Sequence, residues 1–146
     1  MPDVVFVCSG NTCRSPMAAA LFNDLCEKRG LPYRAESAGI HALEGTAASD
    51  GAFYAMKERG LSLSRHVSQP FTAFLAREAR LVVAMNEGIA RVARERCPGV
   101  RVVAFDPPVS DPYGASLADY RATADELARR MDWVLARLAE TSTPAR

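Results

Sequence analysis

The chain has no excess of charge and no long hydrophobic run. Its net charge is +1 over 146 residues, so bulk electrostatics give no reason to expect a nucleic acid or an anionic membrane as a partner. No apolar segment is long enough to cross a bilayer, and the first residues lack the basic and hydrophobic regions of a secretory signal. We therefore expect a cytoplasmic protein that binds neither nucleic acid nor membrane.

Cysteine is scarce, and its spacing does not suit a metal. The four cysteines have no zinc-ligand spacing and lack the density of a disulfide-stapled domain. We expect no metal site and no cofactor. In a reducing compartment the question becomes which thiol is reactive, and the candidates are Cys8, Cys13, Cys26 and Cys97.

A chain of this length is expected to form one domain. We take residues 1–146 as that domain, with 141–146 as a frayed tail and a monomer as the default state. Nothing resembles an internal repeat or a linker.

Strands and helices are expected to alternate along the chain. The apolar runs 4–7 and 81–85 are typical of strands buried on both faces. Weaker strands are expected at 33–38 and 100–105. A first helix is expected to begin with Ser15 as N-cap and to end at Gly30. Further helices are expected at 47–59, 72–79, 86–96 and 116–140. This alternation predicts an α/β fold with an open parallel sheet and helices on both faces.

The loop after the first strand has the composition of an anion-binding site. Ligands of such folds bind at the carboxyl ends of strands. Gly10 allows a tight bend and Asn11 tolerates a left-handed conformation, so consecutive N–H groups can turn inward. The next helix adds its free N–H groups, and Arg14 adds a bidentate grip. We expect phosphate to be bound by Ser9, Gly10, Asn11, Thr12, Cys13, Arg14 and Ser15.

Cys8 opens this loop and is the candidate nucleophile. A helix N-terminus and a guanidinium favour its thiolate form, which would face a bound phosphorus atom. Ser15 can donate a hydrogen bond to the sulfur and help it leave. A cysteine after a buried strand is more often a small core residue, but its neighbours Gly10, Asn11 and Arg14 favour catalysis. The loop has no lysine, which excludes a nucleotide-binding P-loop.

Phosphate transfer also needs a proton donor, and a carboxyl group on a loop can supply it. Asp106, Asp111 and Asp119 are the late candidates. Asp111 is preferred because Pro112 and Gly114 build a turn around it. A plain Asp-Pro turn is the alternative reading, and Asp106 is the second choice.

The run Cys8-Ser9-Gly10-Asn11-Thr12-Cys13-Arg14-Ser15-Pro16-Met17-Ala18 resembles the signature of the low-molecular-weight protein phosphatase family. The resemblance continues, in the expected order, in 37–39 (Ser-Ala-Gly), 66–68 (His-Val-Ser) and 111–114 (Asp-Pro-Tyr-Gly). It implies a three-layer, single-domain α/β fold with a four-stranded parallel sheet, and hydrolysis through a phosphocysteine with Asp111 as general acid.

The resemblance also assigns supporting residues. It implies a hydrogen-bonded network that holds the phosphate loop in shape, formed by Asn11, Ser15, Ser37 and His66. It suggests a reversible disulfide between Cys8 and Cys13, although a simply packed thiol at Cys13 is equally acceptable. His41 has no counterpart and is expected on the surface.

The expected partner is a phosphorylated protein, and Thr12 bears on which side chain carries the phosphate. The tyrosine-specific branch commonly has isoleucine at this position, whereas threonine resembles the bacterial protein-arginine-phosphatase branch. A hydroxyl suits a polar guanidinium better than an aromatic ring, and only Tyr113 is an obvious stacking residue. We expect phosphoarginine as substrate, with phosphotyrosine as the alternative. Thr12 can also be read as a loop hydroxyl that satisfies the backbone.

Three other functions fit less well. An arsenate reductase of this fold needs further cysteines close together, and Cys26 and Cys97 do not provide them. A sugar-uptake phosphocarrier would not need Arg14 together with an acid. A non-catalytic phosphopeptide-binding module would lack Cys8 or Asp111.

Overall fold

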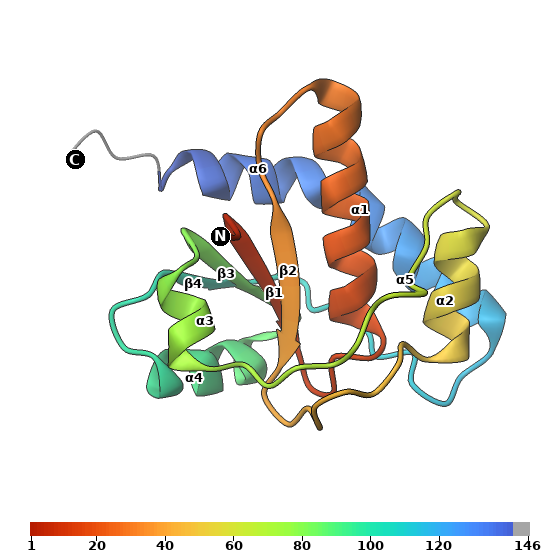
Figure 1. Ribbon diagram of the computed structural model, residues 1–146, viewed down its shortest axis with the longest axis horizontal. Coiled ribbons are helices and arrows are strands. Elements are labelled where there is room, and N and C mark those ends of the chain that lie inside the picture. The colour runs from red at the N-terminus through yellow and green to blue at the C-terminus, as the bar shows by residue number, and fades with distance from the viewer. Residues whose placement is uncertain (142–146) are drawn as a thin grey trace.

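A four-stranded parallel sheet forms the centre of the molecule (Figure 1). The computed structural model describes residues 1–141. The strands lie in the order β2-β1-β3-β4. Their bounds are Val4–Cys8 for β1, Ala35–Gly39 for β2, Leu81–Ala84 for β3 and Val102–Ala104 for β4. The α/β sheet predicted from the sequence is confirmed.

The two central strands are the ones with continuous apolar runs. Every residue of β1 and of β3 is buried, as expected for strands covered by helices on both faces. β1 pairs with β2 on one side and with β3 on the other, so that Cys8 at the end of β1 lies beside Gly39 at the end of β2. The carboxyl ends of these strands therefore meet at one edge of the sheet.

The helices lie on both sides of the sheet. Figure 1 shows α1 on one side and α3 and α4 on the other. α1 packs against α2, α5 and α6, and α4 packs on β3 and β4. The bounds are Arg14–Arg29 for α1, Asp50–Lys57 for α2, Ala73–Arg77 for α3, Glu87–Arg96 for α4, Leu117–Arg129 for α5 and Met131–Ala139 for α6.

The first helix begins two residues earlier than predicted. Cys13 is its N-cap residue and makes no side-chain capping bond, whereas Ser15 lies within the first turn. The Ser15 hydroxyl is fully buried and lies against the Cys8 sulfur. Ser15 as N-cap was therefore wrong, because its hydroxyl is used by the loop instead. Gly30 ends the helix with a φ of 68°, as predicted.

The last predicted helix is two helices. The chain breaks at Arg130, which has φ −99° and ψ 0°, and continues as α6 in a new direction across the sheet (Figure 1). Buried apolar residues continue at helical spacing across the break, as Leu127, Met131, Val134 and Leu138 show, so the sequence gives no sign of it. The Arg130 side chain donates hydrogen bonds to the Pro107 carbonyl and to Glu126, which hold the corner in place.

Two smaller predictions also change. The second helix is shorter than 47–59, because Ser49 caps it and Ala47 pairs instead with Val67 in an isolated bridge. Of the predicted frayed tail, 142–146 lie outside the described residues. Thr141 is held, since its N–H and its hydroxyl both donate to the Leu138 carbonyl. No described helix is long and apolar enough to cross a membrane.

Candidate active site

A pocket of about 340 Å³ opens at the carboxyl end of β1. The loop between β1 and α1 forms its floor, and two later segments form its walls. The lining residues are Cys8, Ser9, Gly10, Thr12, Cys13, Arg14, His41, Leu43, Thr46, Asp111 and Tyr113. The structure thus brings together residues about a hundred positions apart in the sequence.

The Cys8 thiol lies at the bottom of the pocket with two polar contacts. Its Sγ is 2.9 Å from the Ser15 hydroxyl, and the Asn11 N–H donates to it at 3.2 Å. The residue is only 3% exposed. Both contacts stabilise negative charge on sulfur, and they hold the thiol in one position toward the pocket.

Asn11 gives the loop its shape. It has a φ of 58° and is the one non-glycine residue with positive φ in the described chain. The nitrogen of its side-chain amide, Nδ2, donates to Ser15 Oγ at 2.9 Å and to Ser37 Oγ at 3.0 Å. His66 Nε2 lies 2.7 Å from the Asn11 carbonyl, which can only accept, so this nitrogen carries the proton. Asn11, Ser15, Ser37 and His66 therefore form the network that the resemblance implied.

Two further residues that hold the loop between β1 and α1 in shape were not predicted from the sequence. The Gln69 N–H donates to Asn11 Oδ1 at 2.9 Å, so the whole Asn11 side chain is used. At Gly39 a Cβ atom would lie 2.5 Å from the Ser9 carbonyl oxygen, so only glycine lets the end of β2 approach the loop. Gly10, by contrast, is not a positive-φ residue, and the left-handed turn expected of the loop falls on Asn11 alone.

Arg14 and Asp111 face each other across the pocket. The Arg14 side chain is buried, and its Nη1 donates to the Val109 carbonyl at 2.9 Å. Its Nη2 lies 3.5 Å from Asp111 Oδ2. The Asp111 carboxylate is half exposed, and its Oδ1 accepts the Tyr113 N–H at 3.1 Å. This geometry aims both groups at the space above Cys8.

The other acids proposed from the sequence do not line the pocket. Asp106 borders a separate hollow with Phe105 and Pro108. Asp119 belongs to the capping box of α5, where its carboxylate accepts the Ser116 N–H and hydroxyl. Among the three candidates, only Asp111 lines the pocket that holds Cys8.

The residues predicted to contact the substrate lie at the rim of the pocket, but one further residue lies there as well. Thr12 and Tyr113 both line it, and Tyr113 is 75% exposed. His41 is exposed as predicted, but it also lines the pocket, together with Leu43 and Thr46. Its position just after β2, at the same edge of the sheet as Cys8, is the signal that would have identified it.

Cys13 sits against α2 and α5. Its Sγ lies 3.3 Å from both the Ser49 hydroxyl and the Tyr120 hydroxyl. Burial, reinforced by the hydrogen bond with Cys13, raises the pKa of Tyr120 to about 12. All four cysteines are unpaired. A disulfide between Cys8 and Cys13 stays a prediction.

No group of three or more His, Cys, Asp or Glu side chains within residues 1–141 is placed to hold a metal ion. The Arg14 guanidinium is the one cationic side chain among the lining residues other than His41.

Comparison with known proteins gives consistent matches. The family model for low molecular weight phosphotyrosine protein phosphatase matches residues 3–143. A protein-arginine-phosphatase of Bacillus subtilis is 38% identical, covering 86% of this chain and 89% of the relative. A probable low molecular weight protein-tyrosine-phosphatase of Ralstonia nicotianae is 32% identical, covering 90% and 92%.

A solved structure supports the same assignment. It is a cysteine-to-serine mutant of the YwlE arginine phosphatase with a phosphorylated active-site serine. It superposes with a TM-score of 0.87 at 34% identity, covering 93% of this chain and 95% of the other. The chain therefore belongs to the low molecular weight phosphotyrosine protein phosphatase family, a family of cysteine-dependent protein phosphatases.

Proposed function

We propose that this protein hydrolyses phosphoarginine in proteins through a phosphocysteine intermediate on Cys8. The observation that carries the proposal is the arrangement of three groups around one pocket. Cys8 lies on its floor, and Arg14 and Asp111 lie 3.5 Å apart above it. A nucleophile, an anion-binding cation and a proton donor thus surround the same small volume.

In the first step, the Cys8 thiolate attacks phosphorus while Asp111 protonates the leaving nitrogen. The loop N–H groups and Arg14 bind the phosphoryl oxygens as charge develops on them. The bond from phosphorus to nitrogen breaks, a bond from phosphorus to sulfur forms, and the arginine side chain leaves with the proton.

In the second step, the ionised Asp111 accepts a proton from water, which attacks the phosphocysteine. The sulfur leaves as a thiolate, and the hydrogen bonds from Ser15 and the Asn11 N–H stabilise its charge. Because each group returns to its starting state, neither a metal nor a cofactor is required.

Phosphoarginine is favoured over phosphotyrosine for three reasons. Thr12 presents a hydroxyl at the pocket wall, where an aromatic ring would gain from an apolar side chain. The Asp111 carboxyl group can accept hydrogen bonds from the guanidinium N–H groups, and in its protonated form it donates its proton to the leaving nitrogen. The arginine phosphatase of Bacillus subtilis is also more similar to this chain than the tyrosine phosphatase of Ralstonia nicotianae, 38% against 32%.

Phosphotyrosine remains the second candidate, because the Tyr113 ring is exposed at the rim and can stack on an aromatic substrate. Arsenate reduction is less favoured. Cys26 lies in α1 and Cys97 at the end of α4, and both are buried away from the pocket. We further propose a monomer, one domain over 1–146, in a reducing compartment such as the cytoplasm, where Cys8 stays a free thiol.

The test is the release of inorganic phosphate from two peptides of the same sequence, one carrying phosphoarginine and the other phosphotyrosine. We expect a higher kcat/KM for phosphoarginine, and no turnover by Cys8→Ser with either peptide. A strong preference for phosphotyrosine would overturn the substrate assignment. Turnover by Cys8→Ser would overturn the mechanism.

A further inference from the structure

A second groove, of about 480 Å³, adjoins the catalytic pocket. It lies between α2 and the segment 113–120, and Tyr113 lines both hollows. A polypeptide whose phosphorylated side chain enters the catalytic pocket can pass over the rim at Tyr113, which the two hollows share. The groove is therefore within reach of the residues that flank the phosphorylated one.

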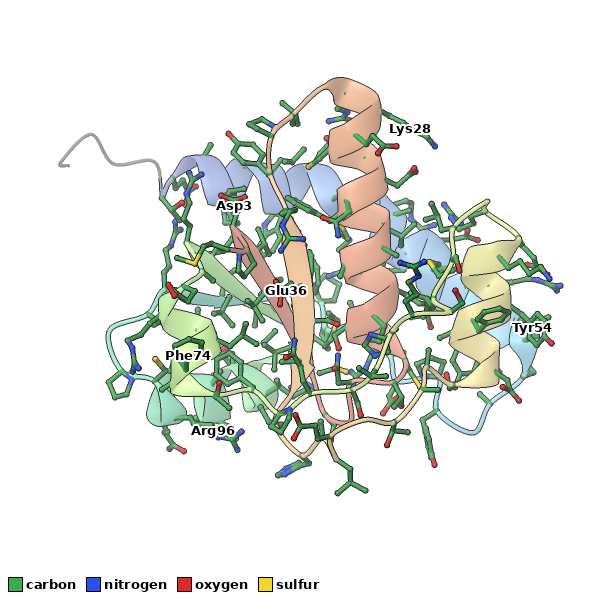
Figure 2. The ribbon with its side chains drawn as sticks, in the orientation of Figure 1. Asp3, Lys28, Glu36, Tyr54, Phe74 and Arg96 are labelled. Atoms are coloured by element: carbon green, nitrogen blue, oxygen red, sulfur yellow. The ribbon has the colours of Figure 1, made fainter. Side chains whose placement is uncertain are left out.

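The walls of the groove are aromatic. Tyr54 and Tyr113 are 50% and 75% exposed, and Leu117 adds an aliphatic surface. Figure 2 shows Tyr54 on α2, at the end of the molecule opposite α3 and α4. Large exposed side chains of this kind are uncommon without a partner when they gather beside a binding site.

The groove also carries negative charge. Asp50 is the one charged residue that lines it, and it forms no ion pair with any residue of 1–141. Asp50 and Tyr54 are four positions apart on α2, so both side chains lie on the same face of the helix. A carboxylate beside an aromatic face attracts a cation with an aliphatic stem.

We propose that this groove binds a lysine or arginine side chain of the substrate, close in sequence to the phosphorylated residue. The aliphatic stem packs on Tyr54 and Tyr113, and the cationic end pairs with Asp50. This inference rests on the proposed function, since it assumes that the catalytic pocket acts on phosphorylated proteins. It adds a preference for basic sequences around the phosphorylated side chain.

The test compares phosphoarginine peptides that carry lysine or its uncharged analogue norleucine at each flanking position in turn. Lysine at one position is expected to raise kcat/KM about fivefold over norleucine, and added salt should reduce this difference. Asp50→Asn and Tyr54→Leu should each weaken the preference. Two matched variants at the opposite end of the molecule, Glu95→Gln on α4 and the exposed Phe74→Leu on α3, should retain it.

Equal rates for lysine and norleucine peptides would overturn the proposal, as would a lysine preference that survives both groove variants. A norleucine preference would assign the groove to apolar side chains instead and would also overturn it. Free phosphoarginine, which has no flanking residues, provides the reference for the proposed function. If phosphate is released only from phosphotyrosine, the proposed substrate fails, and the lysine preference is then measured on phosphotyrosine peptides with the same sequences.

Discussion

The guanidinium of Arg14 and the carboxylate of Asp111 form an ion pair across the mouth of the pocket, with Nη2 and Oδ2 3.5 Å apart. Arg14 is buried and is also held by the Val109 carbonyl, whereas the Asp111 side chain is half exposed. The arginine is therefore the fixed partner and the aspartate the movable one. In the mechanism that we propose, a phosphate dianion bound by Arg14 replaces the carboxylate as its closest anion and frees Asp111 to act on the leaving group.

Asp111→Asn should lower kcat/KM for phosphoarginine, which reports the first step alone, by about 10² to 10⁴, the usual contribution of a general acid. The loss should be much smaller for para-nitrophenyl phosphate, whose leaving group departs without a proton. Steady-state kinetics with both substrates measure the difference. Asp106→Asn is the matched control, because Asp106 lines a different hollow. An equal loss with both substrates would show that Asp111 only shapes the pocket.

Ser15→Ala should slow the second step more than the first. The hydroxyl lies 2.9 Å from Cys8 Sγ, and a hydrogen bond to a charged sulfur contributes about 1.5–3 kcal/mol. Its loss corresponds to roughly a ten- to hundredfold fall in kcat. Because the thiolate is the leaving group of the second step, phosphocysteine should accumulate, and a rapid-quench measurement should show a larger burst. A fall in kcat without a larger burst would contradict this role.

Thr12→Ile should shift the substrate preference toward phosphotyrosine by about tenfold, because it replaces a hydroxyl with an apolar side chain at the pocket wall. The ratio of kcat/KM for matched phosphoarginine and phosphotyrosine peptides measures it. Thr46→Ile is the control, since Thr46 also lines the pocket but comes from the segment after β2. If both variants shift the ratio equally, general apolarity and not the position of Thr12 sets the preference.

The parts of the site that the sequence predicted are those with a local cause. The buried strand, the loop of small residues and the helix after it place Cys8 and Arg14 at the carboxyl edge of a parallel sheet, where ligands bind. Asp111 was found because its own turn residues surround it. None of these predictions requires knowledge of which distant segments touch.

The parts that were missed depend on such contacts. Gly39 matters because the Ser9 carbonyl approaches it, and Gln69 because its N–H reaches Asn11. The Tyr120 hydroxyl reaches Cys13 from α5, and nothing local in the sequence indicates this contact. The break at Arg130 could not be predicted either, because apolar residues recur at helical spacing from α5 into α6.

Gly51→Ala should destabilise the fold, although alanine normally favours a helix by up to about 1 kcal/mol. A Cβ at this position would lie 2.3 Å from the Tyr120 ring, so α2 and α5 would have to separate. We expect the free energy of unfolding to fall by about 1–3 kcal/mol, as for other overpacked sites. Urea denaturation measures it.

Gly88→Ala on α4 is the matched control for this substitution. Its Cβ would meet only Asn86 Oδ1, at 3.4 Å, so stability should be unchanged or slightly raised. If Gly51→Ala is as stable as Gly88→Ala, the contact between Gly51 and Tyr120 does not constrain the packing of α2 on α5.

Tyr120→Phe should change how stability depends on alkaline pH. Burial, together with the Cys13 hydrogen bond, raises the pKa of Tyr120 from 10.0 to about 12 in the folded protein. Between these values the folded protein keeps a proton that the unfolded chain has lost. The stabilisation of the folded protein by the protonated Tyr120 hydroxyl is therefore complete below about pH 10 and is lost as the pH rises through about 12.

The variant lacks this titrating group, so its free energy of unfolding should fall less steeply over that pH range than that of the wild type. Urea denaturation at several pH values measures the slope. Tyr54→Phe, which removes a half-exposed phenol on α2, is the matched control variant. Equal slopes for Tyr120→Phe and the wild type would mean that Tyr120 titrates alike in the folded and unfolded states, which would contradict a raised pKa in the folded protein.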